Sequence, residues 1–277
     1  MEIFESIILA VIQGLSEFLP ISSSGHLTLA QHIFGTDLHS RISLDIILHI
    51  GTLVSVCIAF HKLIISLIIE FGVMLRDIFT GKFSFKNRSP QRNMIFMLFV
   101  ACLPLIPVYP FKDFFEIVKE EKFIVILGIC FLITSVLLFL SDRCVKGRKE
   151  IGDIKVRNAV SVGVFQVFAL LPGISRSGAT ISSGLFCGFN RKTAVQFSFL
   201  LSMPAILGGA LSHVSELKES ASNSIGIFPM VIGFVVSAIV GLMAIKLVSW
   251  LIKTDRFSIF AIYTAIVGII TIIYGII

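Results

Sequence analysis

Apolar residues dominate the chain in long runs, and polar residues gather between these runs. Runs long enough to cross a bilayer as a helix occur near residues 43–66, 92–110, 122–141, 193–212, 228–249 and 257–277. Two pairs of shorter apolar segments are each joined by a Ser-containing stretch with a proline: 3–19 with 22–35, and 157–171 with 175–189. We predict about six full transmembrane helices and two hairpins of half-helices that enter the membrane and turn back. If the first helix of each hairpin were a full span, the number of crossings would be eight.

The polar stretches inside the two hairpins repeat each other at an offset of 153 residues. The matched pairs are Gln13 with Gln166, Ile21 with Ile174, Ser22 with Ser175, Ser24 with Ser177 and Gly25 with Gly178. Three predicted crossings, an odd number, separate the hairpins, so the second copy enters from the opposite face. We therefore predict one membrane domain, 1–277. Its first repeat, 1–141, is a hairpin plus three helices, and its second, inverted repeat is 142–277.

Composition agrees with this pattern. The chain is 56% hydrophobic and only 14% charged, whereas a soluble domain has about a quarter of its residues charged. The sequence therefore predicts an all-α, polytopic integral membrane protein. The net charge of +6 lies in the loops, which favours a role in membrane orientation over binding to nucleic acid.

The basic residues predict the orientation. Sixteen of the 23 Lys and Arg residues lie in segments assigned to one face: 62–92, 142–157, 191–192 and 253–256. The other face receives Arg41, loop 111–122 and Lys218. Basic loops stay in the cytoplasm, so we predict that the first face is cytoplasmic, that both termini lie outside and that the first hairpin opens outward.

The first hairpin carries candidate chemistry. Gln13 and Glu17 are four residues apart and share one face of a helix, and a carboxylate at membrane depth indicates function. The alternative is a helix-end Glu that reaches the interface. Ser22, Ser23 and Ser24 suit the N-cap and first turn of the next half-helix, where free N–H groups and the helix dipole attract an anion. The alternative here is capping alone.

The second hairpin repeats the anion site with an arginine. Ser175, Arg176, Ser177 and Gly178 stand at its tip, and Thr180 follows one turn later. The guanidinium fork matches phosphate oxygens, although a structural ion pair is the alternative. Two helix N-termini, an Arg and several hydroxyls describe a site for a multiply charged anion such as a diphosphate.

Further groups on the first half add acid, base and nucleophile to this site. Glu17, Ser23 and His26 are of the types that serve in general acid–base and nucleophilic catalysis. Asp45 and His49, also four residues apart, either line the same cavity or pair with each other.

The motifs resemble those of the bacterial undecaprenyl-diphosphate phosphatase family, the bacitracin-resistance type, over essentially the whole chain. They stand as Gln13-Gly-Leu-Ser-Glu17, Ser22-Ser-Ser-Gly25-His26 and Pro172-Gly-Ile-Ser-Arg176-Ser-Gly-Ala-Thr180. The resemblance implies an enzyme of the bacterial cytoplasmic (inner) membrane, with an active site that opens to the outer, periplasmic side. Such an enzyme removes the terminal phosphate of a C55 isoprenyl diphosphate. This recycles the lipid carrier for peptidoglycan synthesis and confers bacitracin resistance.

The resemblance also implies roles for individual residues. Glu17, Ser23, His26 and Arg176 match the family's functional positions. The remaining candidates would bind substrate: Gln13, Ser22, Ser24, Gly25, Ser175, Ser177 and Thr180. A divalent cation, Mg²⁺ or Ca²⁺, is expected, with Glu17 as its candidate ligand. Position 13 is Gln where some members have a second acid, so one carboxylate is left for the metal.

Two questions stay open at this point. Ser23 is the favoured nucleophile and His26 its rival, and either Glu17 or His26 would take the proton. The alternative function is a transporter that flips undecaprenyl phosphate, because inverted repeats with broken helices are a common transporter plan. The Glu, Ser and His confined to one half favour the enzyme. A homodimer is left open.

Overall fold

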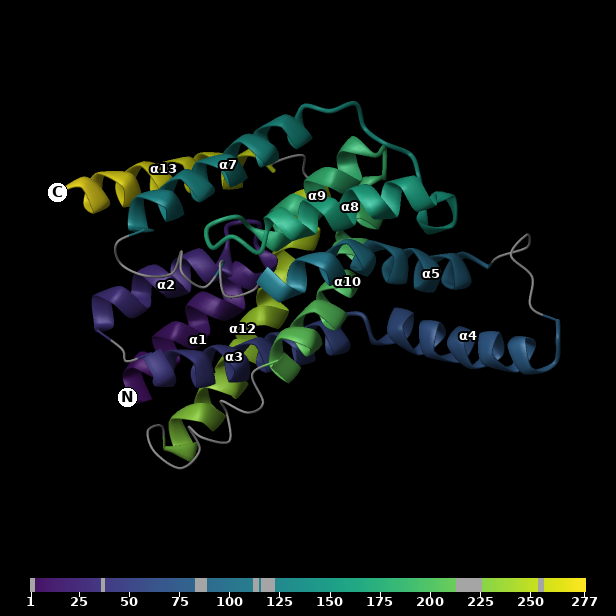
Figure 1. The fold of residues 1–277 in the computed structure, drawn as a ribbon, viewed down its shortest axis with the longest axis horizontal. Helices are drawn as coiled ribbons and strands as arrows, with labels where there is room; N and C mark the ends of the chain where they lie inside the picture. The colour runs from purple at the N-terminus through teal and green to yellow at the C-terminus, as the bar shows by residue number, and fades with distance from the viewer. Residues whose placement is uncertain are drawn as a thin grey trace.

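The computed structural model describes residues 3–35, 38–82, 89–111, 115, 123–212, 226–253 and 257–277, without the side chains of 38–43, 109, 252 and 253. Within these ranges the chain is helical and has no strand (Figure 1). The predicted all-α class is confirmed. The elements are α1 Ile3–Phe18, α2 Ser23–Phe34, α3 Leu38–Ala59, α4 His61–Phe79, α5 Pro90–Cys102, η1 Leu103–Phe111, α7 Ile124–Asp142, η3 Ile151–Asp153, α8 Val156–Phe168, α9 Arg176–Phe186, α10 Arg191–Ser212, α12 Ile227–Lys253 and α13 Ser258–Ile276.

Most predicted membrane spans are present. Among the described residues, five helices are long and apolar enough to cross a membrane, or six if α3 and α4 form one bent span. The helices α7, α10, α12 and α13 each cover one predicted apolar run. The run near 92–110 is α5 continued by η1, whose prolines Pro107 and Pro110 remove backbone donors and prevent a regular α-helix.

The prediction of one straight helix over residues 43–66 was wrong. The chain bends by 84° between α3 and α4, and residues expected in a loop after 62 belong to α4. No proline or glycine causes the bend. Instead Phe60 packs edge-on against Phe199 of α10, with ring centroids 6.0 Å apart. The His61 ring bonds the Ile58 carbonyl at 2.9 Å, which satisfies an acceptor that the bend exposes.

An ion-pair cluster holds α4 against α5. The Arg92 guanidinium on α5 donates to Glu70 and to Asp77 of α4, both at 2.8 Å. The opposite side of α4 presents exposed apolar side chains such as Ile68 and Ile69. The ion pairs thus offset the charges of Glu70 and Asp77 on α4, while apolar side chains on the opposite side of this helix stay exposed.

The two hairpins predicted from the repeat are present as helix pairs, α1 with α2 and α8 with α9. They approach each other from opposite ends of the molecule, and their tips meet at the centre (Figure 1). Helix α1 packs on α12, and α8 packs on α5. This packing is expected if α12 and α5 occupy equivalent positions in the two repeats. The division at 141–142 and the re-entry of the hairpins into a membrane stay predictions.

The two ends of the molecule carry different segments, and the predicted orientation in the membrane stays a prediction. Both termini lie at one end, and the 143–155 connection lies at the other (Figure 1). Several segments of the predicted topology lie outside the described residues: 83–88, 112–114, 116–122, 213–225 with Lys218, 254–256 and the Arg41 side chain.

The orientation can be tested with cysteines at described positions. We expect Arg148→Cys, in the exposed connection after α7, to resist an impermeant thiol reagent in intact spheroplasts. Gly226→Cys, exposed before α12, should react because it lies on the opposite face. The background is Cys144→Ser, which removes the cysteine near position 148. Labelling of both positions from the same side would contradict the inverted repeat.

Candidate functional site

The buried carboxylate of Glu17 is the centre of the site. Its side chain, at the end of α1, is only 4% exposed. Oε1 forms an ion pair with Nη2 of Arg176. Oε2 accepts hydrogen bonds from Ser23 Oγ at 2.6 Å and from Gln13 Nε2 at 3.0 Å. One carboxylate therefore joins both hairpin tips, and the predicted shared face of Gln13 and Glu17 is observed.

Each tip has the same capped helix start. Ser22 caps α2 by accepting from the Gly25 N–H at 3.3 Å, and Ser175 caps α9 by accepting from the Gly178 N–H at 3.0 Å. The capping hydroxyls also contact the serines two positions on, at 3.4 Å and 3.2 Å. Thr134 of α7 holds the second tip by accepting from the Ser175 N–H at 3.0 Å. The sequence repeat is thus a repeat of local structure.

The motif glycines let the two tips touch. A Cβ on Gly25 would lie 2.5 Å from the Phe131 ring and 3.1 Å from the Cα atom of Gly173. A Cβ on Gly178 would lie 3.4 Å from Cβ of Pro20. At Gly25 there is therefore no room for a side chain, whereas at Gly178 the opposite hairpin lies at ordinary van der Waals distance.

A cavity of about 350 Å³ lies between the tips, α3 and α10. Its polar wall contains Ser16, Glu17, Ser22, Ser23, Ser24, Asp45, His49, Ser175, Arg176 and Ser177. Its apolar wall contains Ile46, Ala169, Leu170, Ile174, Ala205, Ile206, Gly209 and Ala210. Most of the candidates predicted from sequence are brought together in the polar wall.

Four candidates lie behind this lining. Gln13 is buried and reaches the cavity only through Glu17, and Gly25 serves the contact between the tips. Thr180 is buried and bonds Ser198 of α10 at 2.6 Å. His26 turns away from the carboxylate, and its Nε2 atom lies 2.9 Å from the Tyr263 hydroxyl of α13.

The sequence left open whether Asp45 and His49 line the cavity or only pair with each other. Both residues line it. His49 Nδ1 donates to the Asp45 carbonyl at 2.6 Å, and its Nε2 atom lies 3.7 Å from Glu17 Oε2. The Asp45 carboxylate accepts from Gln31 Nε2 at 2.8 Å. Their spacing signals a shared helix face, but only the packing of α3 against α1 directs that face toward Glu17.

Among the described residues, two buried polar atoms near the carboxylate have no hydrogen-bond partner, Arg176 Nη1 and Gln13 Oε1. The first is a donor suited to an anion. The second is an oxygen donor of the kind that Mg²⁺ and Ca²⁺ prefer. Among the described residues no group of three His, Cys, Asp or Glu converges as a metal cage. Glu17 lines the cavity and Gln13 does not, so Glu17 is the residue that could hold a cation whose other ligands come from a bound phosphate, as is common for Mg²⁺.

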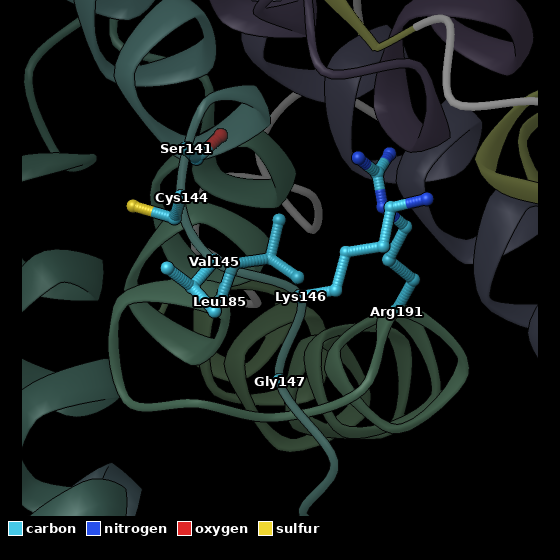
Figure 2. Close-up of a pocket in the computed structure, with 7 residues that line it drawn as sticks. All are labelled: Ser141, Cys144, Val145, Lys146, Gly147, Leu185 and Arg191. Atoms are coloured by element: carbon cyan, nitrogen blue, oxygen red, sulfur yellow. The ribbon is translucent and has the colours of Figure 1, made fainter.

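A smaller cavity of about 150 Å³ lies elsewhere, where the connection after α7 meets α9 and α10. Figure 2 shows its lining residues, with Lys146 and Arg191 among them. Arg191 is paired with Asp142 at 3.0 Å. This cavity contains no carboxylate facing a hydroxyl, and it is separate from the site.

The fold and the cavity describe a helical membrane protein with a buried ion pair and a cavity between two helix starts. The family described as bacitracin resistance protein BacA matches residues 6–270. The chain belongs to this family, as the motifs predicted.

Relatives match over nearly their whole length. The undecaprenyl-diphosphatase of Methanosphaera stadtmanae is 40% identical over 100% of this chain and 99% of its own. That of Alkaliphilus metalliredigens is 38% identical over 99% of each chain. The undecaprenyl-diphosphatase 4 of Bacillus thuringiensis subsp. konkukian is 36% identical over 96% of this chain and 95% of its own.

The contact between the tips predicts a stability effect at Gly25. Gly25→Ala should destabilise the protein by about 1–3 kcal/mol, because the fully buried Phe131 ring must move. The control is Gly208→Ala on α10, where a Cβ meets no atom within 4 Å and alanine favours the helix by about 0.5–1 kcal/mol. Thermal unfolding in detergent measures both. Equal midpoints for the two variants would contradict the close approach.

Proposed function

We propose that the protein hydrolyses undecaprenyl diphosphate to undecaprenyl phosphate and inorganic phosphate. The observation that carries this proposal is the junction of Ser23, Glu17 and Arg176. A hydroxyl bonded to a buried carboxylate lies beside a guanidinium at the starts of two helices. This arrangement suits attack on a phosphorus atom whose oxygens are held by positive charge.

The charges favour a phosphate ligand. Arg176 uses Nη2 on Glu17, and its Nη1 atom has no hydrogen-bond partner in the part of the chain that the structure describes. The first turns of α2 and α9 present backbone N–H groups and the positive ends of their dipoles to the same cavity. A diphosphate would gain charge-assisted hydrogen bonds from these donors, which are already in place.

In the mechanism that we favour, Ser23 Oγ attacks the terminal phosphorus while its proton passes to Glu17. The 2.6 Å hydrogen bond between them supports Glu17 over His26 as the acceptor of this proton. The bond from the terminal phosphorus to the bridging oxygen breaks, and undecaprenyl phosphate leaves. Water then attacks the phosphoserine, Ser23 Oγ recovers its proton from Glu17, and phosphate departs.

A divalent cation, Mg²⁺ or Ca²⁺, would bind together with the diphosphate, with Glu17 as its protein ligand. When bound, it would offset negative charge on the diphosphate oxygens. The residues themselves orient the nucleophile, and Arg176 balances the charge of Glu17.

The apolar wall suits the lipid part of the substrate. Residues of α10 with small side chains, Ala205, Gly209 and Ala210, continue the cavity away from the polar wall. The first isoprene units would lie along these residues, and the rest of the chain would stay in the bilayer. We place the site on the outer side of the bacterial inner membrane, where the reaction would recycle the lipid carrier for peptidoglycan synthesis and confer bacitracin resistance.

The direct test is phosphate release from undecaprenyl diphosphate by purified protein in detergent. We expect release that chelator abolishes and that added Mg²⁺ or Ca²⁺ restores. Ser23→Ala should be inactive, whereas Ser24→Ala should keep most of the activity. Absence of phosphate release by the wild-type protein would refute the proposed function.

Arg176 should be essential for the rate. Arg176→Ala should lower kcat by about 100- to 1,000-fold, as expected for the loss of one preorganised charge. Arg176→Lys should also be poor, because a lysine cannot hold Glu17 and a phosphate with a planar fork. Steady-state phosphate release measures both variants. Arg176→Ala with more than half of the wild-type kcat would contradict the shared site.

The course of the lipid tail can be tested on two adjacent glycines. Both face open space on α10, but Gly209 lines the cavity and Gly208 does not. Gly209→Leu should raise KM for the C55 substrate by about tenfold, or ~1.4 kcal/mol of binding. Gly208→Leu, the matched control, should leave KM unchanged. Equal KM values would show that the tail does not pass Gly209.

A further inference from the structure

Ser22 has the one positive φ among the described non-glycine residues, with φ 74° and ψ 96°. This conformation is strained for a residue with a side chain, and such strain persists only where surrounding contacts enforce it. Ser22 directly precedes Ser23, so its backbone angles set the direction in which the Ser23 hydroxyl points. That hydroxyl lies 2.6 Å from Glu17 Oε2.

The Ser22 carbonyl accepts a hydrogen bond from the backbone N–H of His26 at 3.2 Å, and the ring of His26 adds a second contact to the same oxygen. The His26 Nδ1 atom lies 2.8 Å from the Ser22 carbonyl oxygen. A carbonyl only accepts, so Nδ1 carries the proton and donates it. In the neutral ring Nε2 is then the acceptor, and it receives the hydrogen bond of the Tyr263 hydroxyl at 2.9 Å.

Aromatic packing fixes the ring in this orientation. The His26 and Tyr263 rings are stacked, with centroids 5.7 Å apart and an angle of 10° between their planes. The Phe131 ring of α7 meets His26 edge-on at 5.1 Å. The first turn of α2 is thereby tied to α7 and α13.

The second repeat supplies an internal comparison. There Ser175 replaces Ser22 and has an ordinary φ of −69°. The residue that corresponds to His26 is Ala179, whose backbone N–H donates to the Ser175 carbonyl at 2.8 Å but which has no ring to add a second contact. A positive φ at the N-cap serine and a histidine four residues later therefore occur together in the first repeat, and neither occurs at the equivalent positions of the second.

We propose that His26 and Tyr263 are positioning residues. The Tyr263 hydroxyl holds the imidazole so that Nδ1–H clamps the Ser22 carbonyl, which keeps Ser23 aimed at Glu17. The proposal rests on the proposed phosphatase function and deepens it. It assigns to His26 a role through its Nδ1 atom, and it brings α13 into the support of the site.

Variants at position 26 separate the two ring nitrogens. The amide nitrogen of His26→Asn can take the place of Nδ1 and donate to Ser22, whereas His26→Ala supplies no donor. If His26 positions the turn, His26→Asn should retain at least about tenfold more kcat than His26→Ala. If Nε2 is a nucleophile or proton carrier, the two variants will be equally inactive, and the proposal is overturned.

A variant at position 263 tests the hydrogen bond between the Tyr263 hydroxyl and His26 Nε2. Tyr263→Phe keeps the ring but removes the hydroxyl, and it should lower kcat by about three- to tenfold while KM stays within about twofold. Tyr274→Phe, an exposed tyrosine on the same helix, is the matched control and should leave kcat unchanged. Wild-type kcat in Tyr263→Phe would overturn the proposal. Gel filtration and thermal unfolding check that each variant is folded.

A measurement that does not need activity completes the test. In ¹⁵N-histidine NMR spectra the signal lost in His26→Ala belongs to His26. We expect it to show a protonated Nδ1 and a hydrogen-bonded Nε2 whose shift changes in Tyr263→Phe. A protonated Nε2 in the neutral ring would overturn the clamp. If the wild-type protein released no phosphate, this spectrum would still decide the role of His26 in the turn.

Discussion

The ion pair between Glu17 and Arg176 is the interaction on which the rest of the site depends. The two residues come from different repeats, 159 positions apart, and both side chains are largely withdrawn from solvent. A lone buried carboxylate or guanidinium costs several kcal/mol of desolvation, and each is tolerated here because the other lies beside it. The pair thus links the two hairpins, and it also leaves one nitrogen of Arg176 for a ligand.

Close packing makes this pair geometrically possible. The tips approach closely because Gly25 carries no Cβ where the Phe131 ring of α7 and Gly173 of the opposite hairpin pass. The same approach brings the starts of α2 and α9 to one cavity, where both helix dipoles would act on a bound anion. Gly25 therefore serves the assembly of the site more than the flexibility of the chain.

The two repeats share a scaffold and divide the chemistry. Both have a capped helix start with paired serines, but the first contributes the carboxylate and the hydroxyl of Ser23, whereas the second contributes the guanidinium. The difference extends to the backbone, since Ser22 is left-handed and Ser175 is not. The asymmetry directs one hydroxyl at the carboxylate, which suits catalysis at one phosphorus atom.

Much of the architecture followed from the sequence alone. Long apolar runs predicted α7, α10, α12 and α13 because backbone groups in lipid must bond within their own helix. The offset repeat predicted the two hairpins, and the family followed from the motifs at their tips. The bend at Phe60 did not follow from the sequence, because it depends on packing against Phe199 and not on a local helix breaker. The orientation of His26 toward Tyr263 and of His49 toward Glu17 was also decided by tertiary structure. Spacing along a helix says which residues share a face, but only the neighbouring helices determine what that face meets.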